Sequence, residues 1–357
     1  MLSRTIKILS YRQLLLLLLA SFSFQSTAEI EAKWQRIDIN KKVSLRGCAV
    51  SGNTFWVSGS NNSVFVSQDN GITWADRSVK ASPKTDFRDI ALFDKNTAIV
   101  MGAGEGSQSV LYKTTDAGKT WQVLKQNKDA KGFYDSIAFW DEQRGLLLGD
   151  PVDGFYLVEK TQDGGKTWRR IAKTKLPIMY DKEAAFAASG NTIITGENGK
   201  AWLTTGGFSA SVYYSEDFGE NWQRQAVPLF DDTQTAGGYG LALNHEQQVF
   251  VLGGDYQQRS TRYNNIATFI KKTWQRVAAK QRGLRTAMSC LNETCIATGK
   301  TGSDISIDGG KTWQAFDDKH AAEGSRGFYT LASGKDVILA AGVDGKVAVY
   351  LKPQQHR

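Results

Sequence analysis

The sequence predicts an all-β protein: a seven-bladed β-propeller of four-stranded antiparallel blades, closed into a ring by its N-terminal strand. Three observations predict this fold. A short motif ending in Trp returns every few dozen residues, which is the signature of a repeat architecture. The 357 residues include 35 Gly and 5 Pro, a composition that suits many short strands joined by tight turns. The first and last repeats are each incomplete, and each lacks the part that the other has.

The repeated motif has the pattern S/T-x-D-x-G-x-T/N-W. Its Asp carboxylate can accept N–H groups of a tight turn, the Gly two residues later tolerates positive φ, and the Trp buries a large surface. Each copy is therefore predicted to be a β-hairpin held by a structural Asp and a Trp anchor. The copies are 67–74, 114–121, 161–168, 215–222 and 306–313, with Asp69, Asp116, Asp163, Asp217 and Asp308 as their aspartates.

Two incomplete repeats at the chain ends predict how the ring closes. Trp34 resembles the end of a repeat without its beginning, whereas residues 327–351 form a beginning without a final Trp. The segment after Trp34 is therefore expected to supply the outer strand of the last blade, which removes free strand edges. Six fuller repeats lie between them, and the fifth is degenerate, with Phe269 and Lys271 in place of Asp and Gly.

The strand order within a repeat separates two faces of the propeller. In the second repeat we expect strands at 88–93, 98–102, 110–114 and 121–124. Turns after strands one and three, including every repeated motif, then share one face. Loops after strands two and four share the other face, and they are longer and more irregular. Binding usually resides in such loops on a rigid scaffold.

The inner strands are expected to begin on that loop face and to carry its candidate binding residues. Several arginine and tyrosine side chains are expected at one level around the central channel. Together they could hold a carboxylate, phosphate or sulfate in bidentate fashion. Alternatively, the Arg and Asp side chains there pair with one another and close the funnel. The residues aligned in one register are Arg46, Arg88, Tyr134, Tyr239 and Arg285, with Asp89, Asp135, Glu183 and Arg326 beside them. Further candidates from the loops are Glu105, Asp150, Asp153, Asp255, Tyr256 and Asp304.

The N-terminus has the features of an export signal. Basic residues precede an apolar run at 14–24, and residues 26–28 offer small side chains for cleavage before Glu29. The apolar run is short for a membrane span. We therefore expect a signal peptide at 1–28, a single propeller domain at 29–357, and a periplasmic or secreted protein with no span after cleavage. An uncleaved anchor is the alternative.

Charge and composition exclude several function classes. The formal charge of +8 falls to about +5 without the leader, which is no indication of nucleic-acid binding. Three dispersed His give no metal-ligand spacing, and no dinucleotide or haem motif predicts a cofactor. Cys290 and Cys295 flank an expected turn, where they form either a disulfide or two buried thiols. A monomer is expected.

The repeated motif resembles the Asp-box, or BNR repeat, of sialidases and other propellers, in which it is a structural corner. Over residues 34–351 the chain also resembles the family related to the photosystem II stability/assembly factor. That resemblance implies an exported seven-bladed propeller. It also implies binding to a membrane subunit under assembly through an arginine-rich patch. It rests on residues 87–89, 104–106, 139–141, 150–154, 184–190 and 253–256.

These observations lead us to expect a non-catalytic binding or assembly factor. Its partner would be a protein client or an anionic ligand, carbohydrate included, on the loop face. The alternative is a sialidase-like glycoside hydrolase, in which Arg46, Arg88 and Arg285 grip a sugar carboxylate and Tyr239 or Tyr134 is the nucleophile. Two features argue against this alternative. Sialidases are propellers of six blades rather than seven, and the expected first strand of this chain has no Phe/Tyr-Arg-Ile-Pro segment.

Overall fold

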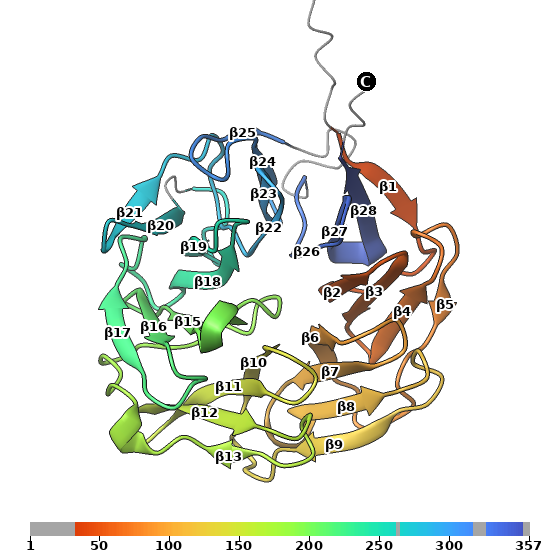
Figure 1. The fold of residues 1–357 in the computed structure, drawn as a ribbon, viewed down its shortest axis with the longest axis horizontal. Helices are drawn as coiled ribbons and strands as arrows, with labels where there is room; N and C mark the ends of the chain where they lie inside the picture. The colour runs from red at the N-terminus through yellow and green to blue at the C-terminus, as the bar shows by residue number, and fades with distance from the viewer. Residues whose placement is uncertain (1–32, 262–264, 317–325, 353–357) are drawn as a thin grey trace, which may run out of the picture. The chain divides into compact units, whose positions relative to one another are not determined.

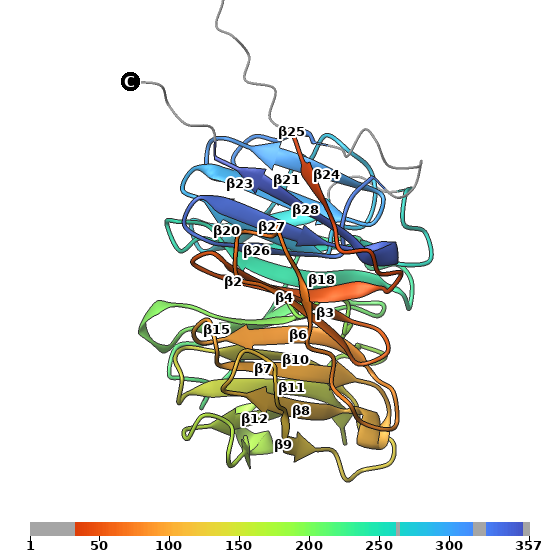
Figure 2. The same ribbon diagram turned by 90° about the vertical axis from the view of Figure 1, so that its right-hand side faces the viewer.

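The computed structural model describes residues 33–261, 265–316 and 326–352. The predicted signal peptide lies outside the described residues. Within them, seven four-stranded antiparallel sheets form the blades of a ring, as predicted (Figure 1). In the side view the strands run across the thickness of the ring, so that their ends form its two faces (Figure 2).

Blades are numbered along the chain, from the inner strand of each outward. Blades 1 and 2 are β2 (Leu45–Ser51), β3 (Thr54–Gly59), β4 (Ser63–Ser67), β5 (Ala75–Asp76), and β6 (Asp86–Leu92), β7 (Ala98–Ala103), β8 (Val110–Thr114), β9 (Gln122–Gln126). Blades 3 and 4 are β10 (Tyr134–Phe139), β11 (Gly145–Val152), β12 (Phe155–Thr161), β13 (Arg169–Arg170), and β14 (Ile193–Thr195), β15 (Ala201–Thr205), β16 (Ser211–Ser215), β17 (Gln223–Ala226). Blades 5 and 6 are β18 (Ala236–Leu243), β19 (Val249–Asp255), β20 (Ile266–Ile270), β21 (Thr273–Val277), and β22 (Ala287–Leu291), β23 (Thr294–Gly299), β24 (Gly302–Ser306), β25 (Gln314–Ala315). Blade 7 is β26 (Thr330–Ser333), β27 (Val337–Ala341), β28 (Lys346–Leu351) and β1 (Gln35–Asp38). Short 3-10 turns lie at η1 (Gly106–Gln108), η2 (Lys173–Lys175), η3 (Glu197–Gly199) and η4 (Val343–Gly345).

The ring closes as the two incomplete repeats predicted. β1 pairs with β28 in antiparallel register, with Gln35 opposite Val349 and Asp38 opposite Lys346. Trp34, just before β1, is buried against Phe316 and Phe328, with ring centroids 5.1 and 4.8 Å away. The N-terminal strand therefore completes the last blade and leaves no gap in the ring.

The hydrophobic core is divided among the blade interfaces. One cluster of buried side chains lies between each pair of neighbouring blades around the ring. Between blades 1 and 2, for example, Trp56 packs with Phe87 and Val100. Burying one such side chain contributes about 1.5–3 kcal/mol to stability. The contacts between neighbouring blades therefore stabilise the ring without any contribution from side chains in the central channel.

Five Asp-box corners have the predicted hydrogen bonds. In the copy between β8 and β9, Asp116 accepts bonds from Thr114 Oγ1 at 2.8 Å, Thr120 N at 2.9 Å and Thr120 Oγ1 at 2.6 Å. The bonds from Thr120, first from its side chain and then from its backbone, lower the pKa of Asp116 to about 2. The corresponding bonds recur at Asp69, Asp163, Asp217 and Asp308.

The degenerate fifth repeat has a different type of turn in place of the Asp-box. Lys271 and Lys272 both have positive φ, 50° and 65°, and form a two-residue turn between β20 and β21. Trp274 still packs on its neighbour, Phe269, at 5.3 Å between ring centroids. The Trp anchor is kept where the Asp corner is lost.

Blade 4 departs from the other blades at its inner edge. Its inner strand, β14, has three residues, and the chain before it runs into the centre of the ring near β15 (Figure 1). We call residues 186–191 the channel segment. It bonds to the inner strand of blade 5, where Leu241 N donates to Asn191 O at 2.8 Å, and to the residue just before the inner strand of blade 6, where Ser189 Oγ donates to Thr286 O at 3.2 Å. The segment therefore lies across the channel.

Candidate functional site at the mouth of the channel

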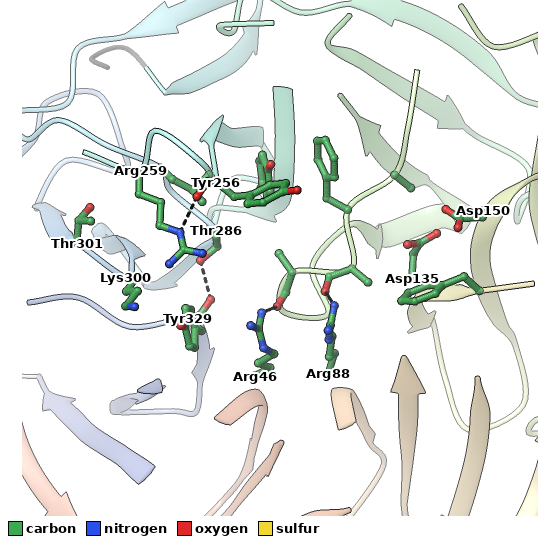
Figure 3. Close-up of a pocket in the computed structure, with 17 residues that line it drawn as sticks. Arg46, Arg88, Asp135, Asp150, Tyr256, Arg259, Thr286, Lys300, Thr301 and Tyr329 are labelled. Atoms are coloured by element: carbon green, nitrogen blue, oxygen red, sulfur yellow. Dashed lines mark hydrogen bonds between the residues drawn. The ribbon is translucent and has the colours of Figure 1, made fainter. Parts of the chain in front are cut away.

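A cavity of about 420 Å³ opens above the channel segment on the loop face (Figure 3). This volume is typical of a site for a small molecule or a few residues of a peptide. All seven blades contribute to its wall. The wall residues used below are Arg46, Arg88, Asp135, Asp150, Phe186, Ala187, Ala188, Tyr239, Tyr256, Arg259, Thr286, Lys300 and Tyr329.

β-Bulges select the residues that face this cavity. In the inner strands of blades 1, 2, 3 and 5, the pairing register shifts by one residue at the strand's beginning. A bulge adds one residue to one strand and re-aims a side chain. The extra residues are Arg46, Arg88, Asp135 and Tyr239, and all four line the cavity.

The predicted register is correct for Arg46, Arg88 and Tyr239 but one residue off for Tyr134 and Arg285. Tyr134 is buried away from the cavity, and its neighbour Asp135 takes the cavity position. A one-residue slip moves a side chain to the opposite face of a strand. The buried residues Leu45, Phe87 and Tyr134 are the better guide, because each directly precedes a cavity residue.

Arg285 is a structural residue. Its guanidinium is fully buried, and Nη2 lies 2.6 Å from Oδ2 of the equally buried Asp304. Asp304 also accepts the backbone N–H groups of Lys280 and Gln281. Thr286, one residue further along, lines the cavity instead of Arg285.

Arg46 and Arg88 lie side by side and hold the channel segment (Figure 3). Arg46 Nη1 donates to Ala188 O at 3.0 Å, and Arg88 Nη1 donates to Ala187 O at 2.7 Å. Both guanidiniums also approach Asp86 Oδ2, at 3.4 and 3.0 Å. Burial, and then the charge of Arg88, lower the pKa of Arg46. Each arginine side chain remains about a quarter exposed.

The channel segment fits closely where it passes β6. Gly190 has φ of 71°, and a Cβ at this position would lie 2.5 Å from Asp89 Oδ1. Only glycine meets both demands. Residues 185–188 line the upper cavity, and residues 189–191 line a second cavity with Asp89 and Cys48. The segment therefore separates the two cavities.

A basic and aromatic wall stands opposite the third blade. Arg259 Nε donates to Tyr256 O at 2.7 Å, and Lys300 lies nearby (Figure 3). Phe186 stacks on Tyr239 at 4.4 Å between ring centroids. Sequence reasoning missed Arg259, Lys300, Phe186, Thr286 and Tyr329. Arg259 and Lys300 follow second strands, and a search for basic residues at those strand ends would have found them.

Two carboxyls form the wall on the side of blade 3, where Figure 3 shows Asp135 and Asp150 next to each other. Asp135 is 1% exposed, and its Oδ2 has no hydrogen-bond partner among the described residues. Burial, and then the neighbouring Asp150, raise the pKa of Asp135 well above its ordinary value. Burial also raises the pKa of Asp150.

Other predicted residues do not reach the cavity. Asp89 is buried and accepts Ser136 Oγ and Ile137 N, both at 2.8 Å, and burial raises its pKa to about 7. Glu183 is buried as well and accepts bonds from Thr205 and Tyr213. Asp255 is buried and accepts two Thr hydroxyls, while Glu105, Asp153 and Arg326 are exposed outside the cavity wall.

The cavity brings together only part of the predicted sialidase-like set, namely Arg46, Arg88 and Tyr239. Arg285 is committed to Asp304, and Tyr134 is buried. Tyr239 donates its hydroxyl to Thr235 O, and burial raises its pKa, so the phenolate that a nucleophile requires is disfavoured. In the part of the chain that the structure describes, no cluster of three potential metal ligands is found, and no helix is long and apolar enough to cross a membrane.

Comparisons with known proteins agree with this fold. The BNR/Asp-box repeat model matches residues 213–224, which include the fourth Asp-box. No curated protein sequence matches the chain. Among solved structures, "YCF48 bound to D1 peptide" matches with a TM-score of 0.66 at 15% identity over 90% of this chain and 96% of that one. YCF48 from Cyanidioschyzon merolae matches with a TM-score of 0.64, also at 15% identity, over 90% and 99% of the two chains.

A glycoside hydrolase shares the fold too. The GH74 enzyme of Niastella koreensis matches with a TM-score of 0.60 at 11% identity, over 88% of this chain and 53% of its own. The chain thus spans about half of that enzyme. At such identities the matches show a common propeller fold, which hosts both binding proteins and hydrolases.

Proposed function

We propose that this protein is a non-catalytic binding or assembly factor that holds a segment of a protein client in the cavity at the channel mouth. The observation that carries the proposal is the pair Arg46 and Arg88, whose guanidiniums bind two consecutive backbone carbonyls in the channel segment. The same cavity adds Arg259, Lys300 and aromatic surface. These groups suit a polypeptide with acidic side chains.

Fold similarity supports a polypeptide as the ligand. A YCF48 propeller of the same fold has been solved with a D1 peptide bound. The sialidase-like alternative has less support, since Arg46, Arg88 and Tyr239 share the cavity but the third assigned arginine, Arg285, is buried in its pair with Asp304. A glycan ligand would require only the Arg and aromatic groups, and it is the competing ligand class.

Export and a monomeric state are further parts of the proposal. The leader-like sequence at 1–28 supports export. So does the disulfide between Cys290 and Cys295, which face each other across the β22–β23 hairpin, because disulfides persist in oxidising compartments. Cell fractionation with N-terminal sequencing tests this, with a mature end at Glu29 expected. Recovery in the cytoplasm with an intact leader contradicts it.

A peptide array tests the ligand class. The full chain is applied to immobilised peptides that vary in acidic and aromatic residues, and the affinities of the best binders are then measured in solution. We expect Arg46→Gln with Arg88→Gln to weaken binding about 10- to 100-fold, since two charge-assisted hydrogen bonds are lost. Arg170→Gln, an exposed position on β13, is the matched control and should bind as the wild type does.

Two results would overturn the proposal. The first is the absence of peptide binding, or binding that the double variant leaves unchanged. The second is turnover of fluorogenic sialosides or other glycosides by the wild type that Arg88→Gln abolishes. That result would make the cavity a catalytic site.

A further inference from the structure

The Asp135 and Asp150 carboxyls stand out among the charged groups that the structure describes, because neither is neutralised by an ion pair. Neither takes part in an ion pair among residues 33–261, 265–316 and 326–352, and the buried Oδ2 of Asp135 accepts no hydrogen bond there. Both line the cavity. A buried carboxylate without a partner is costly, so proteins seldom keep one that only fills space.

Arg88, the basic residue whose charge acts on Asp135, lowers the pKa of that carboxyl less than burial and Asp150 raise it, and it forms no ion pair with it. Arg88 gives Nε to Asp86 at 3.0 Å and Nη1 to Ala187 O at 2.7 Å. The buried hydroxyl of Tyr156, which also lies near the pair, has no hydrogen-bond partner among the described residues. This hydroxyl is uncharged and cannot neutralise a carboxylate. Within the described ranges, the carboxyls therefore face the cavity as an acidic corner that has no ion pair.

The opposite side of the cavity has the complementary character. Arg259 and Lys300 lie across from the acidic corner (Figure 3). The stacked rings of Phe186 and Tyr239 line the same cavity. A ligand that satisfies both sides carries an anionic group and a cationic group separated by apolar or flat surface. Lysine and arginine side chains supply such a cation on a long stem, which can reach a recessed pair of carboxyls.

We propose that Asp135 and Asp150 form a subsite for a lysine or arginine side chain of the bound polypeptide, whose acidic group lies toward Arg259 and Lys300. This subsite rests on the proposed function, because it presumes a polypeptide in the cavity. It adds a sequence requirement: the client segment carries a basic residue beside its acidic one. The cation takes the place of the partner that the fold itself does not provide.

Matched peptides test the subsite. The probes are synthetic peptides that each carry one glutamate and one lysine, beside the same peptides with norleucine, the uncharged analogue, in place of lysine. Fluorescence anisotropy with the full chain gives both affinities at neutral pH. We expect the wild type to bind the lysine peptides about 10-fold or more tightly than the norleucine peptides, as a buried charged hydrogen bond implies.

The variant Asp135→Asn/Asp150→Asn should bind the two kinds of peptide alike, at the affinity of the norleucine series. Asp94→Asn, an exposed position on the Asp-box face, is the control and should retain the preference. Melting curves establish that each variant is folded. A single Asp150→Asn variant, whose residue is less deeply buried, replaces the double variant if the latter does not fold.

The outcomes separate this inference from the proposed function. Equal affinity of the wild type for lysine and norleucine peptides overturns the subsite and leaves peptide binding standing. A preference that survives in the Asn variant also overturns it, since the cation is then bound elsewhere. Failure of every peptide to bind overturns both proposals.

Discussion

Two groups of aspartates in this ring have opposite environments. Each Asp-box aspartate accepts several hydrogen bonds from its own turn, and these bonds hold the pKa of Asp69, Asp116 and Asp163 near 2. Asp135 and Asp150, at the channel mouth, have raised pKa values because they are buried, and Oδ2 of Asp135 has no hydrogen-bond partner in the described part of the chain. The first group is part of a repeated local structure, whereas the second occurs once, beside a cavity.

The arginines divide in the same way. Arg285 is buried in a tight pair with Asp304, whereas Arg46 and Arg88 keep part of each guanidinium at the cavity wall. Charged groups that are satisfied within the protein therefore mark its framework, and those left incomplete at a cavity mark the candidate site. The predictions below separate the two classes, from the largest expected effect to the smallest.

Replacing Arg285 should have the largest effect on stability. Arg285→Gln leaves the Asp304 carboxylate buried without its partner, so the free energy of unfolding should fall by about 3–5 kcal/mol. Arg88→Gln should lower it by only about 1–2 kcal/mol, because Arg88 is partly exposed although it gives up its bonds to Ala187 O and Asp86. Urea denaturation of both variants measures the difference. Equal losses would mean that Arg88 belongs to the framework.

The raised pKa of Asp89 should make the stability of the protein depend on pH. Its pKa is raised to about 7 in the folded protein, so folding favours the protonated carboxyl. The stability it contributes is present below its unfolded pKa of about 4 and is lost as the pH rises toward 7. We expect a fall on the order of 4 kcal/mol from this residue, and Asp89→Asn should flatten the curve in that window. An unchanged slope in Asp89→Asn would contradict the raised pKa.

Removing an Asp-box carboxylate should have a smaller effect on the free energy of unfolding. Asp217→Ala deletes the acceptor for Ser215, Asn221 and neighbouring N–H groups in an accessible turn. Water replaces part of these bonds, so a loss of about 1 kcal/mol in the free energy of unfolding is expected. Peptide affinity should be unchanged. A change in affinity would show that the Asp-box face takes part in binding.

Tyr256 should affect binding but not stability. The residue is 42% exposed at the cavity, and its bond with Arg259 uses only the backbone carbonyl of Tyr256. Tyr256→Ser should change the free energy of unfolding by less than about 0.5 kcal/mol and weaken peptide binding a few-fold. Binding at wild-type affinity would remove Tyr256 from the contact surface.

The fold was predictable because its signals are local and repeated. Five Asp-boxes define the hairpins, and Trp34 without a preceding motif indicates the closing strand. The site depends on local irregularities of the structure that produce no repeated pattern in the sequence. A bulge brings Asp135, and not Tyr134, to the cavity, and the channel segment crosses the ring from a shortened inner strand. Whether a buried arginine has a partner, as Arg285 has in Asp304, also depends on distant segments.

The stability of Asp135→Asn against pH tests most directly whether the cavity carboxyls lack partners. Because the folded pKa of Asp135 is raised, the wild type loses stability from this residue as the pH rises above about 4. Asn cannot ionise, so Asp135→Asn should be more stable than the wild type by about 1–3 kcal/mol at pH 7, and the two should converge near pH 4. A variant less stable than the wild type at pH 7 would show that the Asp135 carboxylate is satisfied within the fold, and the acidic corner would then be framework.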